Sequence, residues 1–240
     1  IKEVSGKKKL PKSLKFKSAK IDSREISNND IFFAIKGKKN DGNKFVAQSF
    51  KKKASLAIVN KIQNKLKINR QIKVKNTLKF LTETSSTIRQ NSSSKIIAIT
   101  GSCGKTSLKE LLKMTLNNFG KTLSSPKSFN NKYGVPLSIF NLNADHQYGI
   151  FEVGMDKKGE IDYLTKILKP DLGIITNISY AHSKNFKNIN GIAKAKSEIM
   201  DNMKPGGKII LNRDDKYFNF LSRKAKLLKL NCSKSKSKIN

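Results

Sequence analysis

A short glycine-rich segment holds the residues of this chain that are best suited to chemistry. Residues 100–106 have the sequence Thr-Gly-Ser-Cys-Gly-Lys-Thr, directly after an apolar run and directly before leucines at roughly helical spacing. A strand, a tight loop and a helix in this order bind phosphate, because backbone amides and the helix N-terminus attract its oxygens. Lys105 would add a charge near the β- and γ-phosphates, and the Thr106 hydroxyl would bind Mg²⁺. The segment therefore predicts a site for ATP.

This loop is shorter than the common nucleotide-binding consensus, in which four residues separate the first glycine from the Gly-Lys pair. Here only Ser102 and Cys103 separate Gly101 from Gly104. A Gly-Ser turn with a lysine exposed by chance is the alternative in so lysine-rich a chain, but the flanking strand and helix favour the phosphate loop. The predicted ATP-binding residues of the loop are Gly101, Ser102, Cys103, Gly104, Lys105, Thr106 and Ser107.

Two further residues lie near the end of later apolar runs or shortly after it, and could complete such a site. Glu152 lies near the end of the run at 148–154, and His182 comes shortly after the run at 172–178. Carboxylate oxygens are good Mg²⁺ ligands. His182 taken alone is more typical of a hydrogen-bonded loop residue. Because the ends of three strands are expected to meet in one crevice, both residues become candidates for a metal region.

The apolar runs also predict the fold that positions these residues. Runs at 95–100, 148–154, 172–178 and 208–212 alternate with helical patterns at about 105–118, 159–168 and 190–203. Continuous apolar runs of this length are typical of strands covered on both faces, as in the parallel sheet of an α/β domain. Ligands are then expected at the carboxyl ends of the strands.

A smaller α/β unit precedes this domain. Its predicted strands lie at 30–37, 55–60 and 72–74, its helices at 44–54 and 77–90, and a polar hinge at 91–94 follows. We therefore expect domains at 1–92 and 93–240. The chain has no initiating Met and ends in a lysine- and serine-rich stretch, 231–240, without apolar periodicity. We expect that stretch to be a polar tail and the chain to be a piece of a longer protein.

The formal net charge of +33 suggests nucleic acid as a partner. However, only five of the fifty basic residues are arginine, and the lysines are spread along the whole chain. Arginine is favoured where proteins read bases or stack on them. We therefore expect the lysines to lie on solvated surfaces and the chain to have no specific nucleic acid partner. No apolar run approaches the length of a membrane span, and we expect a cytoplasmic protein that is a monomer. Cys103 and Cys232 lie far apart in the chain, so we expect both thiols to be reduced.

Six segments resemble, in order and approximate spacing, the motifs of the Mur ligase family. They are "ITGSCGKTSLKELL", "SFNNKYGVPLS", "FEVGMDKKGEI", "TNISYAHSKNF", "GIAKAKSEI" and "LNRDD". The first unit agrees, since "DSREISNNDIFFAIKGKKNDGNKF" resembles the UDP-sugar-binding domain of the family. The likeness covers residues 20–220 and is strongest to members that add D-alanyl-D-alanine to UDP-N-acetylmuramoyl tripeptide. It implies a small α/β UDP-sugar-binding domain, an ATP-binding P-loop domain with a mainly parallel sheet, and a third domain that this chain lacks.

The resemblance also implies a role for particular residues. Thr106 and Glu152 would bind one Mg²⁺, His182 would help bind a second, and Asn130 or Asn131 would contact the nucleotide and metal region. Lys196 matches a family lysine that is carbamylated and then supports a magnesium ion; without the resemblance it would be taken for a solvated side chain. The matched residues near the UDP-sugar are Ser23, Arg24, Asp41 and Gly42. A surface ion pair is an alternative for Arg24, and the roles of Asn212, Asp214 and Asp215 stay open.

The implied reaction is an ATP-dependent ligation in peptidoglycan precursor synthesis. A substrate carboxylate attacks the γ-phosphate of ATP to give an acyl phosphate, and an incoming amine then displaces phosphate. Lys105, Lys196 and His182 are the implied catalytic residues. Because domain closure completes such sites, we expect the 240-residue chain alone to be inactive.

Three other functions are compatible with parts of the sequence. Another Mur ligase or a folylpolyglutamate synthase would share the phosphate loop. A nucleic-acid-dependent ATPase would use the loop and the charge, but the chain has no Trp and no recognisable arginine finger. A non-catalytic binder of nucleotide or UDP-sugar is the third.

Overall fold

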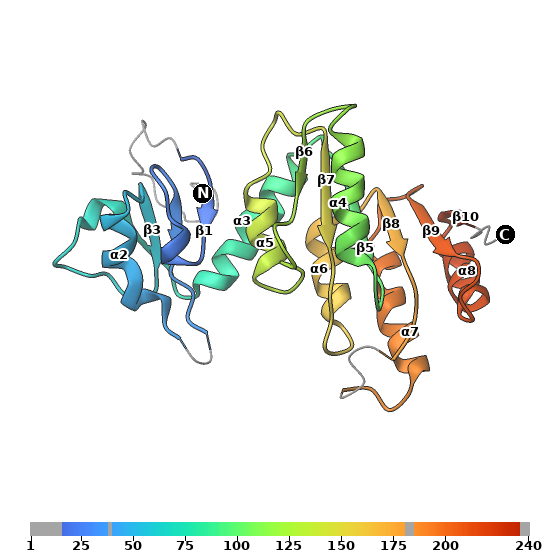
Figure 1. The fold of residues 1–240 in the computed structure, drawn as a ribbon. Coiled ribbons are helices and arrows are strands. Elements are labelled where there is room, and N and C mark those ends of the chain that lie inside the picture. Colours follow the sequence, from blue (N-terminus) through green and yellow to red (C-terminus); the bar gives the residue numbers. More distant parts are fainter. Residues whose placement is uncertain (1–15, 38–39, 181–184, 236–240) are drawn as a thin grey trace. The chain divides into compact units, whose positions relative to one another are not determined.

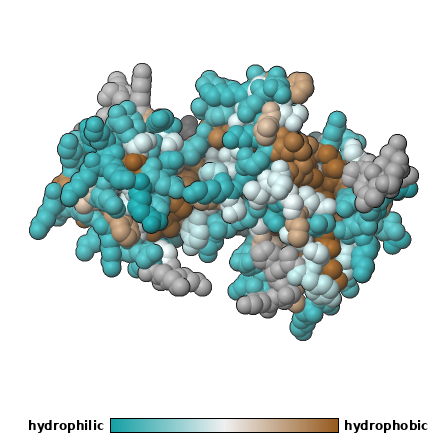
Figure 2. All heavy atoms as spheres, in the orientation of Figure 1, coloured by the Kyte–Doolittle hydropathy of each residue, from teal (hydrophilic) through white to brown (hydrophobic). Residues whose placement is uncertain are grey.

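The computed structural model of the protein describes residues 16–37, 40–180 and 185–235 (Figure 1). The chain forms two compact units. Unit 1 comprises Ile1–Gln90 with Ile139–Asn141, and unit 2 comprises Asn91–Ser138 with Leu142–Asn240. Figure 2 shows hydrophilic residues over much of the face drawn, as the lysine content leads one to expect. In the part of the chain that the structure describes, no helix has the length and apolarity that a bilayer crossing requires.

Unit 1 is built on a parallel sheet of strand order β1-β2-β3-β4. The strands are β1 (Ala19–Lys20), β2 (Ile31–Phe33), β3 (Leu56–Val59) and β4 (Gln71–Lys73). The helical elements are η1 (Ser23–Glu25), η2 (Gly42–Phe45), α2 (Val46–Lys51), η3 (Ile68–Arg70) and α3 (Thr77–Gln90). The β2 and β3 side chains are all buried, and Phe32, Ala57 and Val59 pack with Val46 of α2.

A buried carboxylate joins the segments around β1 and β2. Asp30 is 0% exposed, and its oxygens accept hydrogen bonds from the Ser18 hydroxyl at 2.7 Å and from the Ser27 amide and hydroxyl at 2.9 Å. The β1 edge has only two residues in its strand, so side-chain bonds of this kind supplement a short ladder.

Unit 2 contains a second parallel sheet, of strand order β10-β9-β8-β5-β7-β6. Its strands are β5 (Lys95–Thr100), β6 (Thr122–Ser124), β7 (Tyr148–Glu152), β8 (Leu172–Ile175), β9 (Lys208–Asn212) and β10 (Asn231–Ser235). Ile99 pairs with Glu152 on one side and with Ile174 on the other. The carboxyl ends of β7, β5 and β8 are therefore neighbours at one edge of the sheet.

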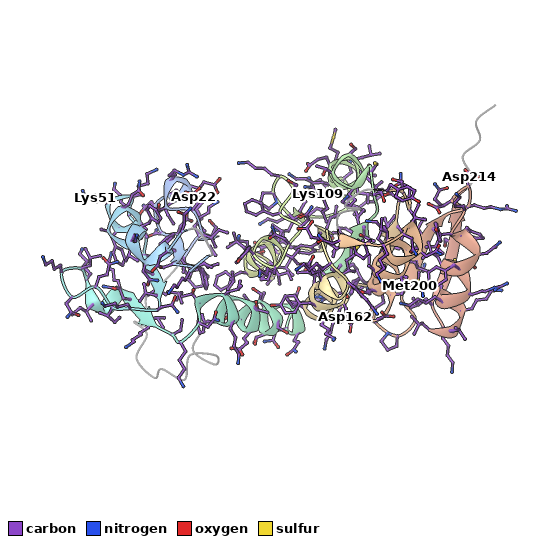
Figure 3. All side chains as sticks on the ribbon, turned by 90° about the horizontal axis from the view of Figure 1, so that it is seen from below. Asp22, Lys51, Lys109, Asp162, Met200 and Asp214 are labelled. Carbon is purple, nitrogen blue, oxygen red and sulfur yellow. The ribbon has the colours of Figure 1, made fainter. Side chains whose placement is uncertain are left out.

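Helices lie on both faces of this sheet. The helical elements of this part of the chain are α4 (Lys105–Leu116), α5 (Gly134–Phe140), whose last residues belong to unit 1, α6 (Glu160–Leu168), α7 (Ile189–Ser197) with η5 (Glu198–Met200), and α8 (Phe218–Leu227). Figures 1 and 3 show α4 on one face, and α6 and α7 on the other. Leucines 108, 112 and 116 of α4 pack against Ile97, Ile99, Ile150 and Ile174 of the sheet. A helix from each face can thus reach the end of β5.

The predicted fold class is confirmed, because both sheets are parallel and alternate with helices. The predicted polar tail is wrong in part: Asn231–Ser235 forms β10, which pairs with β9 along its length. Strand pairing uses the backbone, so polar residues can form an edge strand when a neighbour offers unpaired groups. The preceding α8 supplies apolar burial through Leu221 and Ala225, which the polar stretch itself lacks.

Candidate active site

The loop after β5 has a backbone shape that requires glycine at two places. Gly101 has φ +151°, and a Cβ there would lie 1.8 Å from the Thr176 hydroxyl oxygen. Gly104 has φ +80° and is the N-cap of α4, without a side chain to cap the helix. The first amides of a helix have no intrahelical partner, so the amides at the start of α4 are available to an anion.

The segment after β8 holds this loop in place. The side-chain oxygen of Asn177 accepts hydrogen bonds from the amides of Ser102, at 3.1 Å, and Cys103, at 2.9 Å. The Ser102 hydroxyl donates to the Ser179 carbonyl at 3.0 Å, and the Thr176 hydroxyl donates to the Cys103 carbonyl at 2.6 Å. Two loop amides are therefore already bonded to Asn177. This leaves the helix N-terminus as the main anion-binding surface.

Two lysines from opposite faces of the sheet meet at one carbonyl. Lys105 of α4 and Lys196 of α7 each donate to the Gly101 carbonyl at 2.8 Å. Lys196 is only 2% exposed. Burial, and secondarily the charge of Lys105, lower the pKa of Lys196 from 10.5 to about 8. A substantial neutral fraction of this amine is therefore present near pH 8.

A buried carboxylate lies next to the start of α4. Glu152, the last residue of β7, is 2% exposed. Its Oε2 accepts a hydrogen bond from the Thr106 hydroxyl at 2.7 Å, and its Oε1 accepts one from the Asn130 side-chain amide at 2.8 Å. Gly154 admits Asn130 to this position, because a Cβ at 154 would lie 2.8 Å from the Asn130 amide carbon. The Thr106 hydroxyl and the Asn130 side-chain amide thus meet at the Glu152 carboxylate.

In the described part of the chain, the side-chain oxygens of Glu152 contact neutral donors. Within residues 16–37, 40–180 and 185–235, no ion pair reaches it, and both of its hydrogen-bond donors are neutral. A buried carboxylate normally has a cationic partner or a metal ion. The same residues contain no cluster of three or more His, Cys, Asp and Glu side chains, so the carboxylate and the Thr106 hydroxyl could supply only part of a metal's ligands.

Helix α7 is tied to α6 by a second buried carboxylate, two residues after Lys196. Glu198 accepts hydrogen bonds from the amide of Gly159, at 2.9 and 3.0 Å, and from that of Asp162, at 3.2 Å. These amides lie at the start of α6, where a carboxylate also complements the helix dipole. The contact fixes the part of α7 that carries Lys196.

The predicted UDP-sugar residues lie around α2 in unit 1. The Ser23 hydroxyl donates to the Gln48 side chain of α2 at 2.7 Å. Asp41 caps η2, which runs directly into α2, and Gly42 approaches Ile35 so closely that a Cβ would lie 2.6 Å from its amide nitrogen. Arg24 forms an exposed ion pair with Asp22 at 2.6 Å. The surface ion pair that the sequence offers as the alternative for Arg24 is therefore present.

Other predicted residues lie elsewhere or outside the described residues. The second candidate asparagine, Asn131, caps the start of α5 by accepting from the amides of Tyr133 and Gly134. Ser107 and Cys103 are exposed. His182 belongs to the residues that the structure does not describe. The site as described thus brings together Lys105, Thr106, Asn130, Glu152 and Lys196.

Sequence reasoning missed Asn177 and Lys109, and it left the role of Asp215 open. Asn177 orders the loop, and Asp215 accepts a 2.6 Å hydrogen bond from the Ile178 amide, which fixes the segment after β8. Lys109 of α4 is 0% exposed (Figure 3). The position of Asn177, a polar residue near the end of the apolar run at 172–178, was a usable signal. Nothing in the local pattern distinguishes Lys109 from the other lysines.

Comparisons with known proteins agree with the predicted resemblance. The model of the Mur ligase middle domain matches residues 99–239, and that of the Mur ligase family, catalytic domain, matches residues 15–89. The UDP-N-acetylmuramoyl-tripeptide--D-alanyl-D-alanine ligase of Buchnera aphidicola subsp. Baizongia pistaciae is 38% identical, over 86% of this chain and 45% of that protein. The ligase of the same name from Escherichia coli is 32% identical, over 81% of this chain and 42% of that protein.

Solved structures give the same result. The crystal structure of MurF from Acinetobacter baumannii matches with a TM-score of 0.83 and 33% identity, over 97% of this chain and 51% of that one. MurF ligase from Thermotoga maritima in complex with ADP matches with a TM-score of 0.78 and 26% identity, over 95% and 52%. The chain spans about half the length of the curated relatives it matches. With a family model matched over more than half of its residues, the chain belongs to the Mur ligase family.

Proposed function

We propose that this chain carries the UDP-sugar-binding and ATP-binding parts of a ligase that joins D-alanyl-D-alanine to UDP-N-acetylmuramoyl tripeptide through an acyl phosphate. The relatives named for this reaction match along both units of the chain. The site observation that supports it most is the buried Glu152 carboxylate, bonded to Thr106 at the start of α4. A buried carboxylate beside the start of this helix would suit the metal ion of a bound nucleotide.

ATP fits the loop on geometric grounds. The start of α4 offers free amides and the Lys105 ammonium, which lies 2.8 Å from the Gly101 carbonyl and so at the loop itself. The relative from Thermotoga maritima was solved with ADP, and its likeness covers 95% of this chain. We therefore assign the nucleotide phosphates to the amides following Gly104, with Lys105 as their charge partner.

Mg²⁺ fits the donor set around Glu152. Thr106 and Glu152 present a hydroxyl and a carboxylate oxygen at 2.7 Å from each other, and such hard oxygen donors suit this ion. Bound there, Mg²⁺ would stabilise the charge that develops on the transferred phosphoryl group. Asn130 holds the second carboxylate oxygen and so orients the first. His182 keeps its proposed place at a second metal on the family resemblance alone.

Lys196 fits the role of a carbamylated lysine. Its lowered pKa, about 8, leaves a neutral amine that can attack CO₂, forming an N–C bond and releasing one proton. The product carries a negative charge in place of a positive one beside Lys105. That exchange removes the repulsion between two ammonium groups on the Gly101 carbonyl. A native mass spectrum under CO₂ should show one bicarbonate-dependent adduct, and Lys196→Met should abolish it.

Binding measurements on the 240-residue chain test the nucleotide part of the proposal. We expect calorimetric titration to detect ADP binding that strengthens with Mg²⁺, and separately to detect UDP-N-acetylmuramoyl tripeptide. Lys105→Ala should abolish nucleotide binding and leave UDP-sugar binding intact. Lys113→Ala, on the same helix, is the matched control. Equal loss of both ligands in Lys105→Ala would indicate misfolding and remove the support for a phosphate role.

The ligase activity is tested in the complete gene product. Phosphate release from ATP should require both UDP-N-acetylmuramoyl tripeptide and D-alanyl-D-alanine. If phosphate release depended instead on a folate or on a single amino acid, the proposed reaction would be wrong and that of another family member would be indicated. Stimulation by DNA or RNA without UDP-sugar would contradict a ligase altogether.

A further inference from the structure

Lys109 is a charged side chain with no exposed surface, on the helix that begins at the phosphate loop. Its exposure is 0%, and it is the buried residue of α4, whereas Leu111 of the same helix is 60% exposed. An ammonium group is buried at a high free-energy cost unless its donors are satisfied. Its partners therefore indicate what the burial achieves.

The partners of Lys109 are carbonyls of one neighbouring segment. Its Nζ donates to the carbonyl of Ser125 at 2.8 Å and to that of Lys127. The carboxylate of Glu110 lies 3.2 Å from the same nitrogen, but that side chain is half exposed. Lys127 has φ +50°, a left-handed conformation that is unfavourable for a residue with a Cβ. The ammonium thus holds the segment at a strained position.

The same segment carries the amide that holds Glu152. Asn130 lies three residues after Lys127, and its side chain donates to Oε1 of Glu152 at 2.8 Å. On α4, Thr106 lies three residues before Lys109, hence on the same side of the helix, and it donates to Oε2 at 2.7 Å. One face of α4 therefore reaches both carboxylate oxygens, directly through Thr106 and indirectly through Lys109 and the segment 125–130.

We propose that Lys109 is a positioning residue for the metal site: by fixing the carbonyls of Ser125 and Lys127 it keeps the Asn130 amide on Glu152, which orients this carboxylate. The inference rests on the proposed function, because it assigns Glu152 to a metal ion. It adds a role for a fully buried side chain that is bonded to backbone carbonyls. A lysine suits this position because one ammonium can serve two carbonyls at once.

The role predicts a particular pattern of ADP affinity. Loss of Lys109 should weaken ADP binding in Mg²⁺ and leave ADP binding in EDTA unchanged, because the helix amides and Lys105 remain. Partners that orient a metal ligand typically contribute tenfold or more to metal affinity, so we expect the Mg²⁺-dependent gain in ADP affinity to fall by about tenfold. Residues that act through one another give non-additive effects.

The experiment is a double-mutant cycle on the 240-residue chain. ADP affinity is measured by calorimetry, with Mg²⁺ and with EDTA, for the unaltered chain, Lys109→Met, Asn130→Ala and the double variant. Lys113→Met on α4 is the matched control and should behave as the unaltered chain. We expect each single variant to lose about tenfold of the Mg²⁺-dependent gain, and the double variant to lose no more than either.

Three results would overturn the inference. A double variant that loses about a hundredfold would mean that Lys109 and Asn130 act independently. Equal weakening of ADP in EDTA would mean that Lys109 supports the fold of the loop generally. An unaltered chain without any Mg²⁺-dependent ADP binding would refute the proposed function and this inference together. If circular dichroism shows that Lys109→Met does not fold, Lys109→Gln, which keeps a donor, takes its place in the same cycle.

Discussion

Replacing Lys196 by methionine should change how the stability of unit 2 depends on pH. In the folded chain the pKa of Lys196 is lowered from 10.5 to about 8, chiefly by burial. Between these values the folded chain binds fewer protons at this site than the unfolded chain does. The free energy of unfolding therefore rises with pH through this window. Methionine has similar length and no titration, so it removes this contribution.

The magnitude follows from the two pKa values. The complete difference, from 10.5 to about 8, corresponds to about 3 kcal/mol. Integration from about pH 7 to about pH 9.5 gives about 2 kcal/mol of that total, because the unfolded amine is still mostly protonated at the upper limit. The unaltered chain should thus gain about 2 kcal/mol more than Lys196→Met over this range.

Urea unfolding at the two pH values measures this difference, in buffers free of CO₂ so that the amine stays unmodified. The transition of unit 2 is fitted separately, because two compact units need not unfold together. Lys194→Met, an exposed neighbour on α7, is the control and should follow the unaltered chain. A stability difference between Lys196→Met and the unaltered chain that is the same at both pH values would refute the lowered pKa.

Three further outcomes are expected. Gly101→Ala should destabilise unit 2 by about 2 kcal/mol or more in urea unfolding, because its Cβ would lie 1.8 Å from the Thr176 hydroxyl oxygen; unchanged stability would contradict the loop geometry. Thr106→Val should weaken ADP binding about tenfold in Mg²⁺ but not in EDTA, as measured by calorimetry, and equal loss in both would exclude a metal role. Asp30→Ala should destabilise unit 1 by about 2 kcal/mol and leave the transition of unit 2 unchanged, since it removes a buried acceptor of three hydrogen bonds; a shift of both transitions would count against this.

Long periodic segments could be predicted from the sequence almost to the residue. The predicted helix at 77–90 and strand at 95–100 coincide with α3 and β5. Short or polar elements could not. The strands β1, β6 and β10, with two, three and five residues, carry too little apolar pattern to stand out. These segments form strands because they pair with a neighbouring strand. The pairing cannot be read from the sequence, because the paired residues lie far apart in the chain.

The candidate site shows the same division. The phosphate loop could be predicted because its glycines, lysine and threonine are adjacent in the chain. Glu152 was predicted from its place near the end of an apolar run, and it does lie beside Thr106. The burial of Lys109 could not be predicted, since it depends on carbonyls 16 and 18 residues away. Leu111, one of the leucines at roughly helical spacing after the loop, is 60% exposed in the structure.

The hydrogen bonds that Asn177 makes to the loop leave Cys103 with a fixed backbone and an exposed thiol. We therefore expect the alkylation rate of Cys103 to fall when a ligand covers the start of α4. Cys232, far away on β10, supplies an internal reference in the same molecule. Ligand occupancy at the start of α4 can therefore be followed by mass spectrometry on the unlabelled protein, without adding any residue to it.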